Sequence, residues 1–595
     1  MTEPIRIANC SGFYGDQIDA AARMVRGGPI DVLTGDWLAE LTMLILARTR
    51  AKRPGGGYAR TFVTQMEQVM GECLDRGVKV VSNAGGLDPD RCAEAVAEMA
   101  DKLGLAPTIA YVTGDNILDR LDELAAAGLP ILDFETGEPV AAVNDKNGFI
   151  SANAYLGCWG IVEALAQGAD IVVTGRTTDA AIVCGPAANH HGWDRTDWNA
   201  LAGAVVAGHV IECGTQTTGG NYSFFTELDG MDNPGFPIAE IAADGSSVIT
   251  KHPGTGGGVT VGTVTAQLLY EIGGPSYLGP DVAARFDTIT LAEEAPDRVT
   301  ITGVQGEPPP PTLKVSMNSW GGYRSDLRVA LVGLDIEAKA ALAESVLWRS
   351  TPFGPDDFDA VSISVDRTDK VDPASNTEAT ATWRATLKDR DERKVRSVGS
   401  AMNNMALASI PGFHGLPGTQ IAQPFGVHTS GLIASNLVPQ QVTILGGSTT
   451  VVESAINPGD TSGLAVEPLL PELPDPVGGP TVQAPLGTII GARSGDKGGN
   501  ANLGLFARTP AAAAWLAAEL TTDRLRELLP ETAGLEIERF EFPNIWSVNF
   551  VIHGILQEGV AASTRLDGQA KSLGEWVRAR VVDIPSALLP DGTAS

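Results

Sequence analysis

Short apolar segments alternate with helix-length segments through roughly the first 180 residues, and this alternation constrains the fold more than any other feature. Strands are predicted at residues 5–9, 30–33, 78–81, 108–112 and 170–173. Helices are predicted at residues 17–26, 38–48 and 90–103. Because strands that alternate with helices form βαβ units, the predicted fold class is α/β, with a mostly parallel, Rossmann-like sheet in the N-terminal region.

A chain of 595 residues exceeds the size of a single hydrophobic core. We expect residues 1–280 to form the α/β domain that carries the site, and residues 281–465 to form an α+β module packed on it. Residues 466–484 are rich in proline and glycine, which is typical of a linker. The predicted element order in residues 485–585, β-α-β-β-α, indicates a C-terminal ferredoxin-like α+β domain.

The charge composition narrows the classes of partner. The formal net charge of −30 repels phosphate backbones and anionic lipid, so neither a nucleic acid nor a membrane is an expected partner. Residues 1–8 lack a signal-peptide pattern, and no apolar run is long enough to span a bilayer. The six cysteines form no CxxC pair, which favours reduced thiols and a cytoplasmic location.

Small and polar residues follow each predicted strand of the N-terminal region. In open parallel sheets, ligands bind outside the carboxyl ends of the strands. We therefore expect one rim of candidate binding residues. Its members are Asn9, Ser11, Asp16, Asp36, Asn83, Gly85, Gly86, Asp115 and Asn116.

The segment after the strand at 170–173 carries the pair of charged residues that most clearly indicates a catalytic site. Arg176 and Asp179 lie three residues apart at the predicted ligand edge. The planar guanidinium of Arg176 is suited to clamp a carboxylate or phosphate, and Asp179 is suited to act as a general base. The alternative is structural: an Arg–Asp pair in which Asp179 caps the next helix.

Three further polar segments contribute candidate residues. Glu212 precedes one glycine loop, a second glycine loop follows a lysine, and residues 491–502 form a dense polar loop in the C-terminal domain. Glycine lets backbone N–H groups approach an anion closely. Asp496 and Lys497 are candidate catalytic residues from that loop. The candidate substrate-binding residues of the three segments are Gln216, Gly219, Gly220, Asn221, Lys251, Thr255, Gly256 and Asn500.

The spacing of motif residues disfavours dinucleotide binding, Walker-type phosphate binding and lipase-type hydrolysis. Residues 12–15 with Asp36 lack the three-glycine dinucleotide fingerprint, and Lys251 stands on the wrong side of its loop for a phosphate-binding loop of the Walker type. There is no Gly-x-Ser-x-Gly elbow of a lipase-type hydrolase. The adjacent His190 and His191 cannot share a metal on one helix face, so no metal site is predicted, while a divalent metal held by distant carboxylates stays open.

Long segments of the chain resemble the acyclic terpene utilisation family AtuA. These are the segment Ser151-Ala-Asn153-Ala-Tyr155-Leu-Gly157, the segment Gly175-Arg176-Thr-Thr-Asp179-Ala-Ala, and residues 212–221 and 251–258. Residues 494–498 resemble the small AtuA-like ferredoxin-fold domain. The resemblance covers nearly the whole chain. Asn153 and Tyr155 join the candidate substrate-binding residues.

The resemblance implies a role in the catabolism of citronellol and geraniol, which proceeds through coenzyme A thioesters. Our first hypothesis is therefore an enzyme that acts on a branched acyl-CoA or related carboxylate, by lyase or hydratase chemistry. Arg176 would clamp the substrate, Asp179 would be the base, and Asp496 and Lys497 would close the site. Backbone N–H groups of the glycine loops would stabilise a developing enolate.

Two alternatives remain beside this hypothesis. One is a thioester or amide hydrolase, in which Asp179 or Glu212 activates a water. The other is a non-catalytic ligand-binding or scaffold subunit of a catabolic complex. Under the first hypothesis no cofactor is required, since coenzyme A is part of the substrate. A homo-oligomer is expected, because large catabolic α/β enzymes are commonly symmetric assemblies.

Overall fold

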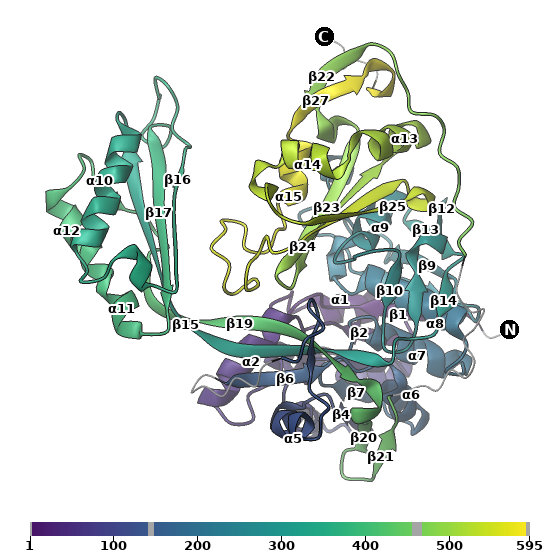
Figure 1. Cartoon of the computed structure of the whole chain (residues 1–595). Helices are drawn as coiled ribbons and strands as arrows, with labels where there is room; N and C mark the ends of the chain where they lie inside the picture. The colour runs from purple at the N-terminus through teal and green to yellow at the C-terminus, as the bar shows by residue number, and fades with distance from the viewer. Residues whose placement is uncertain (1–2, 141–147, 455–466, 591–595) are drawn as a thin grey trace.

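The computed structural model describes residues 3–140, 148–454 and 467–590. Three parts are visible in Figure 1: an α/β body, an arm formed by residues 312–434 that extends to one side, and a C-terminal domain of residues 481–590 that sits on the body. Within the described residues, no helix has the length and apolar character that crossing a bilayer needs.

An eleven-stranded sheet forms the centre of the body. Its five central strands are parallel and lie in the order β1 (Ile5–Asn9), β2 (Val32–Gly35), β3 (Lys79–Ser82), β7 (Ile171–Thr174) and β4 (Ile109–Thr113). The strands beside β1 are β8 (Pro237–Ile241), β9 (Ser247–Lys251), β13 (Arg298–Thr302) and β12 (Thr290–Ala295). The strands beside β4 are β20 (Gln440–Ile444) and β21 (Thr449–Val452).

All six pairings of these flanking strands are antiparallel, against four parallel pairings in the centre. The predicted mostly parallel, Rossmann-like sheet is therefore wrong, and the sheet is mixed. The reason is the length of the connections. Only residues 242–246 join β8 to β9, and such a turn makes a hairpin, whereas a parallel crossover needs a dozen or more residues.

The central strands are apolar because both of their faces are buried. On β1, Ile7 faces one hydrophobic core and Ala8 faces the other. The first core includes the helices α6 (Trp159–Ala166), α7 (Ala181–His191) and α8 (Trp198–Ile211). The second core includes α1 (Ala20–Gly27), α2 (Glu40–Lys52), α3 (Arg60–Arg76) and α4 (Pro89–Leu103). Residues 209–211 are the end of the almost fully buried helix α8.

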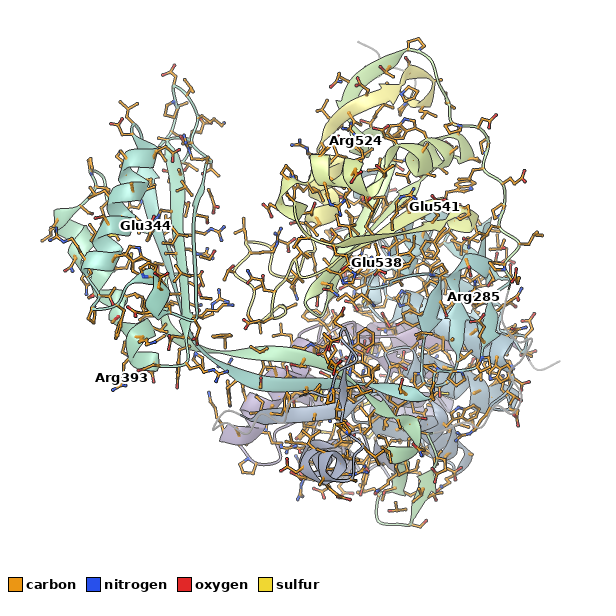
Figure 2. The ribbon with its side chains drawn as sticks, in the orientation of Figure 1. Arg285, Glu344, Arg393, Arg524, Glu538 and Glu541 are labelled. Atoms are coloured by element: carbon orange, nitrogen blue, oxygen red, sulfur yellow. The ribbon has the colours of Figure 1, made fainter. Side chains whose placement is uncertain are left out.

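The arm is built on two unusually long strands. β15 (Thr312–Val332) and β19 (Gln420–Ala434) pair antiparallel and run from the body to a separate layer, where β15 also pairs β17 (Thr380–Asp389). At its body end β15 pairs β6 (Phe149–Ala154). The outer layer contains β16 (Ala360–Asp366), α10 (Ile336–Arg349), α11 (Glu392–Ser397) and α12 (Gly399–Ala408), and it has its own core. Glu344 and Arg393 lie on this layer in Figure 2.

The C-terminal domain is an antiparallel four-stranded sheet with its own hydrophobic core. The strand order is β23 (Ile490–Lys497), β24 (Asn500–Ala507), β26 (Ser547–Ile552) and β25 (Ile537–Phe542). The helices are α13 (Pro510–Glu519), α14 (Thr522–Leu528) and α15 (Leu573–Arg578). The polar loop predicted at residues 491–502 is instead most of the β23–β24 hairpin, in which Arg493, Ser494, Asn500 and Asn502 are buried.

Two buried asparagines of the C-terminal sheet, Asn502 on β24 and Asn549 on β26, join this sheet to the body. The Nδ2 of Asn502 donates to the Leu269 carbonyl (2.6 Å), and its Oδ1 accepts from the Glu271 N–H (2.9 Å). The Nδ2 of Asn549 donates to the Gly273 carbonyl (2.8 Å). Because an unpaired buried polar group is costly, these bonds fix the position of the C-terminal sheet on the body.

We predict that Asn502→Ala lowers the melting temperature. The substitution leaves a buried carbonyl and a buried N–H without their partner, at a cost on the order of 1–3 kcal/mol for each group. Asn404→Ala is the matched control, because Asn404 is exposed and donates one hydrogen bond to Ser350. Calorimetry measures both variants, and an equal melting temperature for Asn502→Ala and the control contradicts the role of this contact.

Candidate active site

The loops after β2 and β3 meet at the carboxyl edge of the sheet, as the rim prediction expects. The Nδ2 of Asn83 donates to Asp36 Oδ1 (2.5 Å), and its Oδ1 accepts from the Trp37 N–H (2.8 Å). The Leu38 N–H also donates to Asp36 Oδ1 (3.1 Å). Asp36 is only 6% exposed, so this carboxylate is held inside the protein by the loop after its own strand and by that of its neighbour.

Arg176 lies at the centre of the rim, in the turn between β7 and α7. Its backbone N–H donates to Asp115 Oδ2 (2.9 Å), which fixes the turn against the end of β4. Its Nη1 donates to Asp179 Oδ1 (2.8 Å) and to the Leu38 carbonyl (3.1 Å). The guanidinium stacks on the Tyr155 ring at 4.2 Å. Its Nε is buried and has no hydrogen-bond partner among the described residues.

The Arg176–Asp179 ion pair does not act as a helix cap. Helix α7 begins after Ala180, and no side chain caps its N-terminus with a hydrogen bond. The Asp179 side chain is 22% exposed, while that of Arg176 is 2% exposed. Asp179 therefore presents a carboxylate held by a buried cation and still reached by solvent.

Asp36, Asp179 and Glu212 form a group of three carboxylates, which we call the acidic triad. One carboxylate oxygen from each residue lies within 4.8 Å of the others. Glu212 follows the last turn of α8 and is 3% exposed, and its Oε1 lies 3.5 Å from His209 Nδ1. Its Oε2 is buried, and no residue in the part of the chain that the structure describes forms a hydrogen bond with it.

Burial raises the pKa of each triad carboxylate. It raises the pKa of Asp36 to about 8, with a further contribution from the charge of Asp179. It raises the pKa of Glu212 well above the usual range, again with repulsion from Asp179. The pKa of Asp179 is also raised by burial, although Arg176 opposes that shift. Three like charges in one desolvated place repel one another, and one guanidinium does not offset this.

A second charged group adjoins the acidic triad. Glu40 Oε1 accepts from the Tyr155 hydroxyl (2.7 Å) and from Lys314 Nζ (3.1 Å). Burial would raise the pKa of Glu40, but the charge of Lys314, supported by Arg176, holds it well below the usual range. Glu40 stands at the start of α2, and Lys314 belongs to the arm strand β15. Tyr155 connects the two groups, because its ring lies under both Arg176 and Lys314.

The C-terminal domain brings Asp496 and Lys497 towards the same charges, at the end of β23. Lys497 Nζ donates to the Glu271 carbonyl (3.4 Å). Burial raises the pKa of Asp496 to about 6, and the negative charge of Glu40 adds to this shift. The C-terminal hairpin is therefore within electrostatic range of the Glu40–Lys314 pair.

Two more hairpin residues make direct contacts with the body. Arg493 donates to Gln216 and stacks on the Tyr270 ring at 4.0 Å. Asn500 Nδ2 donates to Glu135 Oε1 (3.1 Å). Gln216 and Asn500, two of the predicted substrate-binding residues, thus belong to the contact between the body and the C-terminal domain.

The other predicted rim residues support the loops around the triad. Asn9 Oδ1 accepts from the Ser11 N–H (2.7 Å), and Asn9 Nδ2 donates to the Glu212 carbonyl (3.1 Å). Asn153 Nδ2 donates to Asp115 Oδ2 (2.7 Å). A side chain at Gly85 would meet the Thr174 carbonyl at 2.5 Å, so glycine permits the loops of β3 and β7 to touch. Gly86 has a positive φ of 54°.

The loop after Lys251 is organised differently. Lys251 Nζ is bound to Asp297 Oδ2 (3.0 Å) and to the Thr255 carbonyl (2.8 Å), and a side chain at Gly256 would clash with the Gly230 carbonyl. In the part of the chain described, none of these contacts includes the triad. The loop at Gly219, Gly220 and Asn221 has positive φ at its first and last residues (121° and 59°).

Comparison with known protein families assigns the chain. The sequence model of the acyclic terpene utilisation family protein AtuA matches residues 5–444, about three quarters of the chain. The chain belongs to the AtuA family. The AtuA ferredoxin-like domain matches residues 484–583, so the predicted family and its fused C-terminal domain are both confirmed. No curated protein and no solved structure matches this chain.

Sequence reasoning missed several charged residues of this AtuA site: Glu40, Glu271, Lys314 and His428. Glu40 follows Asp36 by four residues, so its place at the rim could have been inferred from the same strand end. Lys314 and His428 lie on β15 and β19, far along the chain from the rim. Burial lowers the pKa of His428 to about 4, and its Nε2 contacts Ser316 Oγ (3.1 Å). No local pattern places these two strands beside Tyr155.

Glu271 gives a testable pH dependence. Burial, and then the nearby charge of Asp496, raises its pKa from 4.5 to about 8, against a hydrogen bond from Tyr270. The folded state therefore binds more protons at Glu271 than the unfolded state between these two values, so its contribution to stability is lost as the pH rises from about 4.5 to about 8.

We predict that Glu271→Gln, which cannot titrate, shows a smaller fall in melting temperature between pH 5 and pH 8 than the unmodified chain. The exposed Glu344→Gln on the arm is the control and should keep the original slope. Scanning calorimetry across this range measures all three proteins. Parallel curves for Glu271→Gln and the unmodified chain count against a buried, protonated Glu271.

Proposed function

We propose that this AtuA family member is an enzyme that acts on a branched acyl-CoA thioester or a related carboxylate, by lyase or hydratase chemistry. The observation that carries the proposal is the acidic triad beside Arg176, with Asp179 as its solvent-reached member. Lyase and hydratase steps on acyl compounds move a proton near the acyl carbonyl, so they need a positioned base and a stabilised oxyanion. The family supplies the substrate context, acyclic terpene utilisation.

Asp179 is the base in this proposal. The Nη1 of Arg176 donates to Asp179 Oδ1 at 2.8 Å. The Asp179 side chain is 22% exposed, so a substrate can reach it. The other two triad carboxylates are less accessible than Asp179, because Asp36 is 6% exposed and Glu212 is 3% exposed. A carboxylate whose rotamer is fixed by a buried guanidinium is preorganised for proton transfer.

The cations around Tyr155 are the proposed anion-binding groups. Arg176 keeps a buried Nε without a partner, and Lys314 faces the same ring. A guanidinium with a spare donor suits the carboxylate or thioester oxygen of a substrate. Asp496 and Lys497 would close the site from the C-terminal domain, since their hairpin lies in the electrostatic field of Glu40.

A panel of branched acyl-CoA thioesters, analysed by mass spectrometry, separates the candidate reactions. A lyase gives two carbon fragments, a hydratase changes the mass by one water, and a hydrolase using Asp179 or Glu212 releases free coenzyme A. Binding of thioesters without any product supports the non-catalytic alternative and contradicts an enzyme.

We predict that Asp179→Asn lowers turnover by about 100-fold or more, the low end of the range for loss of a general base. The amide is nearly isosteric but cannot accept the proton. Substrate binding should change little, while loss of the charged partner of Arg176 should lower the melting temperature, so a melting curve without substrate accompanies the kinetics. Steady-state kinetics on the active thioester measure the effect, with the exposed Asp523→Asn as control. Unchanged turnover in Asp179→Asn removes this residue from the mechanism.

We predict that Arg176→Lys weakens substrate binding although the charge is kept. Lysine lacks the planar fork and the Nε donor, and the loss of one charged hydrogen bond costs about 1.5–3 kcal/mol, or about one to two decades in affinity. Equilibrium binding of the same thioester measures this. The measurement is paired with a melting curve, because Arg176 also bonds the Leu38 carbonyl. Full affinity in a stably folded Arg176→Lys variant contradicts the clamp.

A further inference from the structure

With all three carboxylates ionised, the acidic triad would carry more buried negative charge than the protein around it balances. The three carboxylates would contribute −3 and Arg176 +1, which leaves −2 for a bound cation to offset. Glu40 and Lys314 neutralise each other next to this group and do not change the sum. Buried charges in proteins are paired or bind metal ions, because an uncompensated buried charge is very costly.

The triad has the spacing of ligands that share one ion. Two oxygens bound to the same ion at 2.0–2.6 Å can be at most about 4–5 Å apart. The triad oxygens all lie within 4.8 Å of one another. Among the described residues, this is the one group of acidic, histidine or cysteine side chains with such spacing.

An independent observation points to a missing partner. Glu212 is 3% exposed, yet its Oε2 has no hydrogen bond and is closed off from solvent. Buried carboxylate oxygens normally accept hydrogen bonds or bind a cation. Glu212 also offers a carboxylate oxygen to the triad, so a cation bound there would supply a partner for this buried side chain.

The ligand chemistry selects the class of cation. All three donors are carboxylates, and hard oxygen donors suit Mg²⁺, Mn²⁺ or Ca²⁺, whereas Zn²⁺ and Cu²⁺ prefer nitrogen and sulfur. The carboxylates are also oriented from outside the triad. Asn83 donates to Asp36 at 2.5 Å and Arg176 donates to Asp179 at 2.8 Å. Such outer contacts are typical of metal ligands.

We infer that Asp36, Asp179 and Glu212 bind one small divalent cation of the Mg²⁺ or Mn²⁺ class. A single divalent ion brings the formal charge of the group to zero. The inference deepens the proposed function, since the ion would polarise an oxygen of a substrate that approaches Asp179. Cation binding itself does not depend on that function and is measured without substrate.

The test is a titration of the full chain, first treated with a chelator, with MnCl₂. Isothermal calorimetry and the electron paramagnetic resonance of free Mn²⁺ report the stoichiometry and the affinity. We expect one ion per chain and an increase in melting temperature as Mn²⁺ saturates the site. Mg²⁺ should compete for the same site.

Glu212→Gln and Asp36→Asn are the decisive variants. Each keeps the shape of its side chain and removes one anionic ligand, so we expect Mn²⁺ affinity to fall by more than about tenfold, given that even outer-shell partners are worth about 10–100-fold. Glu344→Gln, on the exposed face of the arm, should bind as the unmodified chain does. Since the two triad variants lose buried like charge, a melting curve without metal shows that they are folded.

The outcomes separate the inference from the proposed function. No Mn²⁺ binding at millimolar concentration, or equal affinity in all variants, overturns the cation site. Turnover of a thioester that persists undiminished after chelation contradicts the role of the ion in polarising the substrate and leaves the enzyme proposal intact. Tight, triad-dependent binding without turnover of any thioester supports the cation site and contradicts the enzyme proposal instead.

Discussion

Arg176 is the charge on which the arrangement of this molecule depends. It is nearly completely buried, so its guanidinium has to be paired inside the protein. Its partners come from four places in the chain: Asp179 in its own turn, the Leu38 carbonyl before α2, Asp115 after β4 and the Tyr155 ring after β6. Removing one member of a buried pair leaves an uncompensated charge, which costs about 3–5 kcal/mol. The rim loops therefore hold one another in place through this residue.

The order of strands explains how residues so distant in sequence reach one site. β7 is inserted between β3 and β4, so the turn that carries Arg176 lies between the loops that carry Asn83 and Asp115. The arm then adds Lys314, because β15 passes beside β6 before it leaves the body. In this way the long ribbon of the arm is attached to the site by an ion pair with Glu40, and not only by its own strand pairing.

The strand-end rule predicted the part of the site that depends on parallel strands. It brought Asp36, Asn83 and Arg176 to one edge, and the structure places them there. It had no means of placing Glu212, whose position follows from how the buried helix α8 packs. The strand-end rule also does not apply to the strands within 237–302. Short turns join them into antiparallel hairpins, which makes the sheet mixed. The polar residues at 491–502 predict a loop, whereas in the hairpin their side chains bond partly to the body and partly to the rest of the C-terminal domain.

The contact between the C-terminal domain and the body is both mechanical and electrostatic. Asn502 on β24 and Asn549 on β26 supply directional hydrogen bonds, which tolerate little sliding of the C-terminal sheet on the body. The negative charge of Glu40 contributes to the raised pKa of Asp496, and electrostatic repulsion acts on both residues. A shift of the domain would therefore change the charge state of Asp496 and the environment of the Glu40–Lys314 pair together. Since Tyr155 joins that pair to Arg176, a series of electrostatic and aromatic contacts connects the C-terminal domain to the acidic triad, in addition to the hydrogen bonds of the two asparagines.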